Sequence, residues 1–350
     1  MTLAATVIIP ARDAAHTIGQ AVRAIRGQTC PDGRGVEVVV VDDGSLDGTA
    51  EVARAAGARV LPAGGDGPAR ARNLGLAEAA TPLVIFTDAD CAARPGFVAA
   101  LLAPFDDPAV GGAKGAYETE QRGLVPRFVQ QEYEERYARM ARRPSIDFID
   151  TYAAAYRRDL LQAVGGFDER YRRPSTEDQE LSFRVAATGA RLVFVPGARV
   201  SHLHAATLGA YALKKAKIGH FKVATLRRHP GKAVDDAHTP ASLKLQVALA
   251  PLVLLTPAAW LVARLLLPTL PAEAALVAAL VAVAPAAAFA LTTLPLWLRC
   301  LARDWPAGLA APGLIAVRAL ALGVGLATGL LAECRGGVLG RSSTGTADAA

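Results

Sequence analysis

The sequence predicts an α/β protein in which a mostly parallel, Rossmann-like sheet covered by helices is followed by C-terminal transmembrane helices. Short apolar segments alternate with segments of helical spacing over the first half of the chain, which is typical of a parallel sheet. Hydrophobic residues make up 52% of the 350 residues, and after Leu245 they form long runs. Carboxylates follow successive strand-like segments, at Asp42-Asp43 and at Asp88-Ala89-Asp90.

The elements of the first half are expected to follow one another as strand and helix. Ile18, Val22 and Ile25 repeat with helical spacing. The β-branched run at 36–41 is typical of a strand buried on both faces. In chain order we expect strands at 6–10, 36–41, 59–61, 82–87 and 192–195, and helices at 14–27, 47–56, 68–79, 124–140 and 176–188.

Composition gives little sign of a secreted protein. The four cysteines show no paired or metal-type spacing, so nothing indicates an oxidising compartment. The first ten residues have no basic segment, and their apolar run is too short for a signal peptide, so a first strand is expected there. The many alanines, arginines and glycines favour a bacterial source with a GC-rich genome.

The Asp-x-Asp motif at Asp88 and Asp90 comes directly after a buried strand. Open α/β sheets bind ligands at the carboxyl ends of their strands. Two oxygen ligands one residue apart suit Mg²⁺ or Mn²⁺ held together with the phosphates of a substrate. The alternative is that acidic residues only terminate strands, but the ordered set with Asp42-Asp43 and Thr176-Glu177-Asp178 favours a ligand site.

Several spaced motifs together resemble the family 2 glycosyltransferases of the GT-A fold. The resemblance covers about residues 6–204, and the motifs occur in the order of that family. In the first part they are Val7-Ile8-Ile9-Pro10-Ala11-Arg12, Val40-Val41-Asp42-Asp43-Gly44-Ser45, Ala71-Arg72-Asn73 and Phe86-Thr87-Asp88-Ala89-Asp90. Further on they are Tyr156-Arg157-Arg158, Gly165-Gly166-Phe167-Asp168-Glu169, Thr176-Glu177-Asp178-Gln179 and Val200-Ser201-His202.

The resemblance implies a nucleotide-sugar site. Asp42 or Asp43 would contact the base and ribose, and the alternative is a simple turn. Arg72 would approach the diphosphate, because a planar cation suits phosphate oxygens, and the alternative is a solvated helix face. UDP-sugar is the implied donor. The donor-binding residues implied are Pro10, Arg12, Asp42, Asp43, Arg72, Asn73 and Asp88.

The resemblance also implies a metal and a catalytic base. Asp88, Asp90 and His202 would hold Mg²⁺ or Mn²⁺, with Asp90 the more direct ligand, although a lone histidine is as often structural. Thr176 is a predicted N-cap with Gln179 at N3, a capping box. Asp178 would then lie in the first helical turn, where it could deprotonate an acceptor hydroxyl. Glu177 is grouped with it as a catalytic candidate, and the alternative is that both only cap the helix.

The acceptor is less well defined by the sequence. Many relatives have an asparagine shortly before Tyr-Arg-Arg, where this chain has Ala153-Ala154-Ala155. Many also have Glu-Asp-x-Asp-Leu, where this chain has Glu180 in place of the last aspartate. Both differences fall where the acceptor is expected, so its identity stays open.

Three apolar stretches, at about 247–267, 274–298 and 309–332, are each long enough to cross a bilayer. A cluster of lysines and arginines before the first one argues for the cytoplasmic side and for anionic lipid headgroups rather than nucleic acid. We therefore expect a catalytic domain at 1–206, a basic interfacial helix at 207–245, about three transmembrane helices at 246–334 and a disordered tail at 335–350. The expected location is a bacterial cytoplasmic membrane, crossed several times, with the catalytic domain in the cytoplasm.

Two features of the third stretch need an explanation. Arg318 lies near its middle, where a charge is costly, and it could meet a lipid phosphate, snorkel or indicate a displaced span. Gly325 and Gly329 form a small-xxx-small pattern suited to close helix packing. Three crossings would place the tail outside, and Arg335 and Arg341 argue against that.

The sequence thus predicts an inverting, metal-dependent transfer of a sugar to a lipid or lipid-linked acceptor, such as a polyprenyl phosphate. One alternative is a processive polysaccharide synthase. Those usually carry Gln-x-x-Arg-Trp, but no tryptophan of this chain follows an arginine. Another alternative is a non-catalytic membrane protein that binds a nucleotide sugar.

Overall fold

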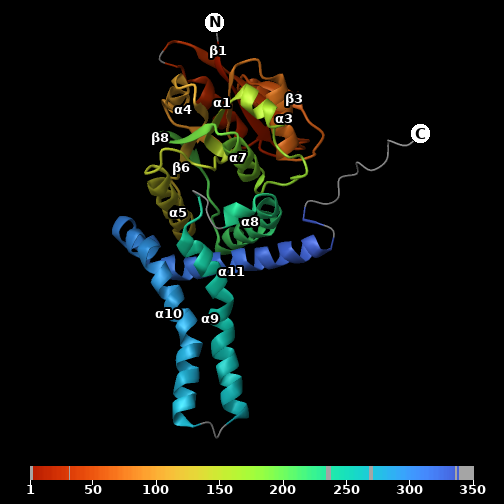
Figure 1. Ribbon diagram of the computed structural model, residues 1–350. Coiled ribbons are helices and arrows are strands. Elements are labelled where there is room, and N and C mark those ends of the chain that lie inside the picture. The colour runs from red at the N-terminus through yellow and green to blue at the C-terminus, as the bar shows by residue number, and fades with distance from the viewer. Residues whose placement is uncertain (1–2, 31, 234–237, 268–270, 336, 339–350) are drawn as a thin grey trace, which may run out of the picture.

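The computed structural model describes residues 3–30, 32–233, 238–267, 271–335 and 337–338. A twisted sheet with helices against it forms the N-terminal half, and long helices form the C-terminal part (Figure 1). Most of the predicted tail at 335–350 lies outside the described residues.

The sheet has eight strands in the order β3-β2-β1-β4-β7-β6-β8-β5. The strands β1 to β4 form a parallel block, and β6 is parallel to β8, while β7 and β5 pair in the antiparallel sense. Their bounds are β1 Leu3–Ala11, β2 Gly35–Asp42, β3 Arg59–Pro62, β4 Leu83–Phe86, β5 Cys91–Ala93, β6 Val110–Glu118, β7 Ala154–Arg157 and β8 Arg191–His202.

Neighbouring residues of the central strands enter two different cores. Val7 packs in a cluster with Ile18 and Val22 of helix α1, whereas Ile8 packs in a second cluster with Leu76 of helix α3. Successive side chains of a strand point to opposite faces, so a continuous apolar run is needed when both faces are covered. The predicted α/β fold with a mostly parallel sheet is confirmed.

The helices of this half lie close to their predicted positions. Residues 124–140 are helical as expected, and the helix that carries Asp178 begins at Glu177. The bounds are α1 Ile18–Arg26, α2 Thr49–Ala55, α3 Pro68–Glu78, α4 Phe97–Leu102, α5 Leu124–Met140, α6 Arg158–Ala163, α7 Glu177–Ala187 and α8 Leu208–Arg228. Short 3₁₀ turns cover Ala103–Asp106, Thr151–Ala153 and Pro230–Ala233.

Three long apolar helices complete the chain, as the sequence predicts. They are α9 Ala241–Leu266, α10 Ala272–Arg303 and α11 Trp305–Cys334, and each is long and apolar enough to cross a membrane. In Figure 1, α9 and α10 extend side by side away from the sheet. Helix α11 instead runs across the base of the N-terminal half, next to α8.

Candidate functional site

The carboxyl ends of β1, β2 and β4 meet at one edge of the sheet. Ala11 of β1 is in register with Asp42 of β2, and Ile8 of β1 with Phe86 of β4. Because these strands are parallel, the segments that follow them gather at this edge. The structure therefore brings Pro10, Arg12, Asp42, Asp43 and the Asp88 motif to one part of the molecule.

Asp42 and Asp43 have different surroundings at this edge. Asp42 accepts hydrogen bonds from the backbone N–H and hydroxyl of Ser45, at 3.1 and 2.5 Å. Asp43 is buried, and its Oδ2 accepts the N–H of Gly67 at 3.0 Å. Its Oδ1 is buried without a hydrogen-bond partner in the described chain. The turn alternative accounts for Asp42, whereas Asp43 keeps a free acceptor for a ligand.

Arg72 lies inside the site and is only 5% exposed, so the solvated-face alternative is wrong. Its Nη1 donates to Glu177 Oε1 at 2.9 Å, and its Nη2 donates to Asp88 Oδ1 at 3.2 Å. The guanidinium also lies over the ring of Phe167, 5.5 Å from the centroid. One arginine thus joins the Asp-x-Asp motif to the start of α7.

Asn73, the neighbour of Arg72, holds the Gly-Gly-Phe loop. Its amide nitrogen donates to the Phe167 carbonyl and to Glu169, both at 2.9 Å, and its oxygen accepts the Phe167 N–H at 2.8 Å. Gly166 is close to this amide and has φ +66°, where a side chain would be strained. Asn73 thus positions a loop of the site, and its predicted contact with the donor stays a prediction.

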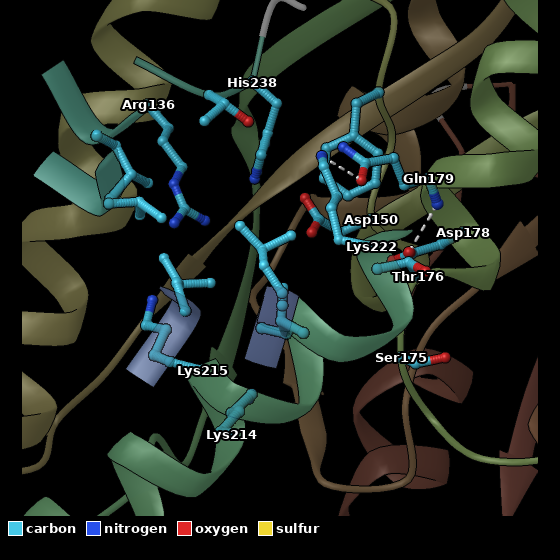
Figure 2. Close-up of a pocket in the computed structure, with 18 of the residues that line it drawn as sticks. Arg136, Asp150, Ser175, Thr176, Asp178, Gln179, Lys214, Lys215, Lys222 and His238 are labelled. Carbon is cyan, nitrogen blue, oxygen red and sulfur yellow. Dashed lines mark hydrogen bonds between the residues drawn. The ribbon is translucent and has the colours of Figure 1, made fainter. Parts of the chain in front are cut away.

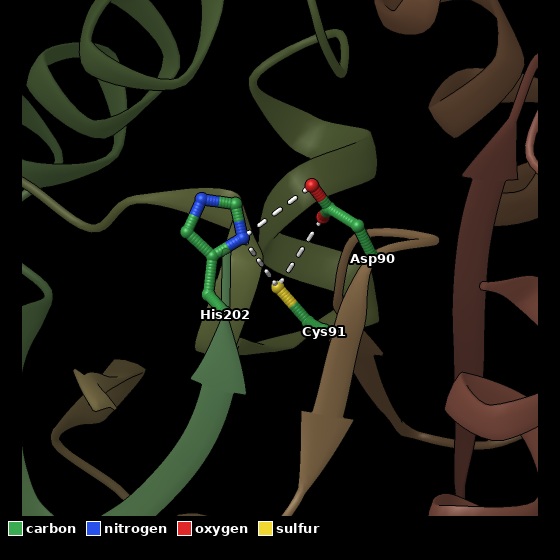
Figure 3. A group of neighbouring side chains, drawn as sticks. All are labelled: Asp90, Cys91 and His202. Carbon is green, nitrogen blue, oxygen red and sulfur yellow. Dashed lines mark hydrogen bonds and ion pairs between the residues drawn. The ribbon is translucent and has the colours of Figure 1, made fainter. Parts of the chain in front are cut away.

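Asp90 and His202 come together beside a third group that the sequence did not indicate. Asp90 Oδ2 lies 3.4 Å from His202 Nδ1, and the Cys91 thiol lies 3.8 Å from the same nitrogen (Figure 3). The potential ligand atoms of these three residues all lie within 4.8 Å of one another. A carboxylate and an imidazole at this spacing suit Mn²⁺ or a similar divalent cation.

Burial and the neighbouring charges change the pKa of the Asp-x-Asp carboxyls in opposite directions. Burial raises the pKa of Asp88, and Arg72 only partly opposes this. For Asp90, burial is outweighed by the hydrogen bond and charge of His202, so its pKa is lowered. The ring of His202 also stacks on Tyr117, with centroids 4.4 Å apart, which fixes its orientation. Asp90 and His202 thus form a close pair, while Asp88 is bound to Arg72.

The start of α7 is tied to α8 rather than closed by the predicted capping box. Thr176 is the N-cap residue, but its hydroxyl bonds the Thr225 hydroxyl at 2.8 Å. Gln179 accepts a hydrogen bond from Lys222 Nζ at 2.6 Å. The Thr225 hydroxyl also bonds the Tyr171 hydroxyl at 2.9 Å. The predicted capping box is wrong, because both side chains bond to residues of α8 instead.

Asp178, the predicted general base, is a carboxyl whose pKa is strongly raised. Burial, followed by the negative charge of Glu177, raises the pKa of Asp178 to about 7. A carboxyl with a pKa near 7 is partly ionised at neutral pH, and its ionised form accepts a proton readily. Lys114, which is buried and pairs with the half-buried Asp150, lies nearby and opposes part of this shift. Sequence reasoning missed Lys114, because the glycine-rich strand β6 gives no strand signal.

A pocket of about 340 Å³ extends from Asp178 to the C-terminal helices. Figure 2 draws Asp150 and Asp178 around it together with the basic residues Arg136, Lys214 and Lys222. Apolar residues of the later helices complete the lining, namely Ile218 and Leu226 of α8, Leu243 and Val247 of α9, and Leu322 and Leu326 of α11. The sequence could not indicate this pocket, because its lining comes from segments far apart in the chain.

The chain thus combines an Asp-x-Asp motif at the end of a parallel strand with a buried carboxyl at the start of a later helix, on a GT-A fold. Residues 6–165 match the profile of glycosyl transferase family 2. The fold also matches a mannosyltransferase from Pyrobaculum calidifontis, solved with GDP-Man and Mn²⁺, with a TM-score of 0.59. That likeness, at 19% identity, covers 94% of this chain and 87% of the other.

Two relatives of known function are similar in sequence. A pre-mycofactocin glycosyltransferase of Mycobacterium tuberculosis is 32% identical over 237 residues, which are 65% of this chain and 48% of the relative. A 4,4′-diaponeurosporenoate glycosyltransferase of Staphylococcus aureus is 34% identical over 134 residues, 36% of this chain and 34% of the relative. The chain thus spans about half the length of the first and a third of the second. The resemblance to family 2 glycosyltransferases that the sequence motifs indicate is confirmed over residues 6–165.

Proposed function

We propose that the chain transfers a sugar, with inversion and with a divalent metal, from a nucleotide-sugar donor to a lipid or lipid-linked acceptor. The donor proposed is a UDP-sugar, and the place is the cytoplasmic face of a bacterial membrane. One observation carries the proposal: Asp178 shares a pocket with apolar residues of α8, α9 and α11. A base and the surface of membrane-type helices then face the same acceptor.

In the proposed reaction, a hydroxyl oxygen of the acceptor attacks the anomeric carbon of the donor sugar. The bond from that carbon to the diphosphate oxygen breaks, and the electron pair leaves with the nucleoside diphosphate. Asp178 takes the proton of the hydroxyl. Arg72 lies between Asp88 and Glu177, where its cation can meet the diphosphate. A single displacement of this kind inverts the anomeric centre.

The donor side of the site includes a place for a cation. Asp90 and His202, with Asp88 next to them in the motif, are the residues proposed to hold Mg²⁺ or Mn²⁺. The Cys91 thiol stays protonated, because burial raises its pKa, so it is a weaker candidate. When bound, such a cation would stabilise the negative charge of the leaving diphosphate.

The pocket favours an acceptor with an anionic group and an apolar chain. Arg136 and Lys214 bring positive charge to its lining. Val247, Leu322 and Leu326 supply an apolar wall on the side of the C-terminal helices. A polyprenyl phosphate has both properties and is the acceptor type we propose. The two relatives are named for action on pre-mycofactocin and on 4,4′-diaponeurosporenoate. Both names are compatible with an acceptor that is not a protein.

The test is sugar transfer from a panel of nucleotide sugars by membranes that contain the full chain, with Mg²⁺ or Mn²⁺ and a bacterial lipid extract. The variants are Asp178→Asn and Asp90→Ala, and the exposed Asp32→Asn is a matched control. Removal of a general base costs roughly 10²- to 10⁴-fold in rate. We expect the Asp178→Asn variant to lose transfer on this scale while it still binds the nucleotide sugar.

Each of the following results would contradict part of the proposal. Full transfer by the Asp178→Asn variant would exclude its role as base. Full activity of Asp90→Ala, or activity in excess chelator, would exclude the metal. Binding of a nucleotide sugar without turnover in any lipid extract would favour a non-catalytic binding protein, and a labelled long polymer would favour a processive synthase.

A further inference from the structure

Helix α11 is bound to the N-terminal half at both of its ends. At the start, Asp304 accepts two hydrogen bonds from Arg127 of α5, from Nε at 2.7 Å and from Nη2 at 2.5 Å. At the other end, Glu333 pairs with Arg227 in the last turn of α8. Both partner helices precede the first long apolar helix in the chain.

The middle of α11 is held by a buried charge network. Arg318 is 3% exposed, and its Nη1 donates to Glu132 of α5 at 2.8 Å. Its Nη2 donates to Gln246 of α9 at 2.7 Å. Glu132 also receives Lys215 of α8 at 3.0 Å and the hydroxyl of Tyr211 at 3.1 Å. The charge that looked unfavourable within a span is therefore neutralised by α5.

Small residues bring α11 into backbone contact with α8. A Cβ added to Gly219 of α8 would lie 2.5 Å from the Leu322 carbonyl oxygen of α11. Additions at Gly325 and Gly329 of α11 would meet the backbone of Ala216 and His220 of α8. The small-xxx-small pattern therefore serves the contact between α11 and α8.

These contacts decide how α11 meets the membrane. A helix of 30 residues is about 45 Å long, whereas the hydrocarbon core of a bilayer is about 30 Å thick. If α11 crossed the bilayer, Asp304 and Glu333 would lie on opposite sides. Arg127 and Arg227, their partners, lie on helices that come before any crossing. Both ends of α11 therefore lie on one side.

We infer that α11 lies in the plane of the membrane surface and that the bilayer is crossed only by α9 and α10. The partner of α11 is the boundary between lipid headgroups and acyl chains. Its exposed side chains suit this boundary, since they include a tryptophan at the start and aliphatic residues along the helix. They are Trp305, Leu309, Val324, Leu330 and Leu331.

Two crossings also agree with the distribution of arginines, which three crossings do not. With two crossings, Arg299, Arg303 and Arg335 come to the same side as the basic helix α8. Arg341 lies outside the described residues. Three crossings would separate Arg335 from the other arginines. Basic residues collected on one side are the usual pattern of membrane proteins.

The test is the sidedness of single thiols in the full chain. Cys334 at the end of α11 is exposed, whereas Cys30, Cys91 and Cys300 are buried. A membrane-impermeant maleimide is applied to sealed spheroplasts and to inverted vesicles. In the background Cys334→Ser, the substitution Glu51→Cys reports the side of the catalytic half, and Ala272→Cys reports the far end of α9 and α10.

We expect Cys334 to react from the same side as the Glu51→Cys thiol and from the side opposite to the Ala272→Cys thiol. Reaction of Cys334 together with the Ala272→Cys thiol would show that α11 crosses the membrane and would overturn the inference. A protease-cleavable tag after Ala350 gives a second measurement of the side on which α11 ends. It decides the question if the Cys334 thiol is shielded from the reagent. Neither measurement depends on enzymatic activity, so the inference is tested apart from the proposed function.

Discussion

Arg72 in the site and Arg318 in α11 are two buried arginines with similar first partners and different surroundings. Each donates to a buried glutamate, at 2.9 Å for Arg72 and 2.8 Å for Arg318. The second partner of Arg72 is Asp88, whose side chain is 32% exposed, whereas the second partner of Arg318 is the buried amide of Gln246. The Arg72 network is therefore partly exposed and is called the open network, whereas the Arg318 network is buried throughout and is called the closed network.

The difference shows that a buried ion pair does not by itself identify a functional site. The sequence suggested a phosphate for both arginines, but the geometry of Arg318 leaves its guanidinium occupied by Glu132 and Gln246. In the closed network, burial alone would raise the pKa of Glu132, but Lys215 and Arg318 outweigh it and lower this pKa to about 2. The carboxylate therefore stays charged and structural.

The largest effect is expected when the closed network loses its anion. The substitution Glu132→Ala leaves Lys215 and Arg318 buried without a carboxylate, and breaking a buried pair in this way costs roughly 3–5 kcal/mol. Thermal unfolding in detergent would measure the loss. The double substitution Glu132→Leu with Arg318→Leu should recover part of it. An unchanged melting temperature for Glu132→Ala would show that the network does not hold α11.

A smaller effect, on catalysis rather than stability, is expected in the open network. In the substitution Arg72→Lys, one ammonium group replaces a fork that reaches both Glu177 and Asp88. Loss of a donor that stabilises transition-state charge costs roughly 10²- to 10³-fold in kcat. The matched change Arg318→Lys should lower the melting temperature and leave kcat per folded molecule unchanged. If both variants behave alike, the two networks are not distinct.

The smallest effect is a dependence on pH. Because burial and Glu177 raise the pKa of Asp178 to about 7, its reactive carboxylate form is lost as the pH falls below that value. We expect kcat/KM for the acceptor to fall about tenfold per pH unit on the acidic side. The residual rate of the Asp178→Asn variant should lack this dependence. This titration lies roughly between pH 5 and 8. A flat profile over that range would contradict the assignment of Asp178 as the base.

The sequence predicted those parts of the fold that depend on local patterns. The β-branched run of β2 and the helix α5 lie where expected. Strand β6 was missed because its glycines carry no strand propensity. They are required by packing, since a Cβ at Gly112 would lie 2.9 Å from Ile149, Leu192 and Tyr156. That constraint comes from residues distant in the chain, which no local pattern contains.

The residues of the site likewise divide into those that the sequence predicts and those that only the fold brings together. Asp90 and His202 were both predicted as metal ligands, and the structure places them 3.4 Å apart. The strand predicted at 192–195 is longer in the structure, where β8 runs from Arg191 to His202. Cys91 joins them only because β5 pairs with the end of β8. The orientation of α11 could not be predicted either, because its length and hydropathy match those of α9 and α10. Only its bonds to α5 and α8 distinguish it.

The hydroxyl of Thr225 has a mechanical consequence. It bonds Tyr171 and Thr176, on the segment just before the proposed base, and it belongs to α8, which packs along α11. With α11 on the bilayer surface, a shift of α8 against the lipids would reach the segment around Asp178 through Thr225 and through the bond from Lys222 to Gln179. The proposed base is thus connected, through α8 and α11, to the membrane surface from which the proposed acceptor would come.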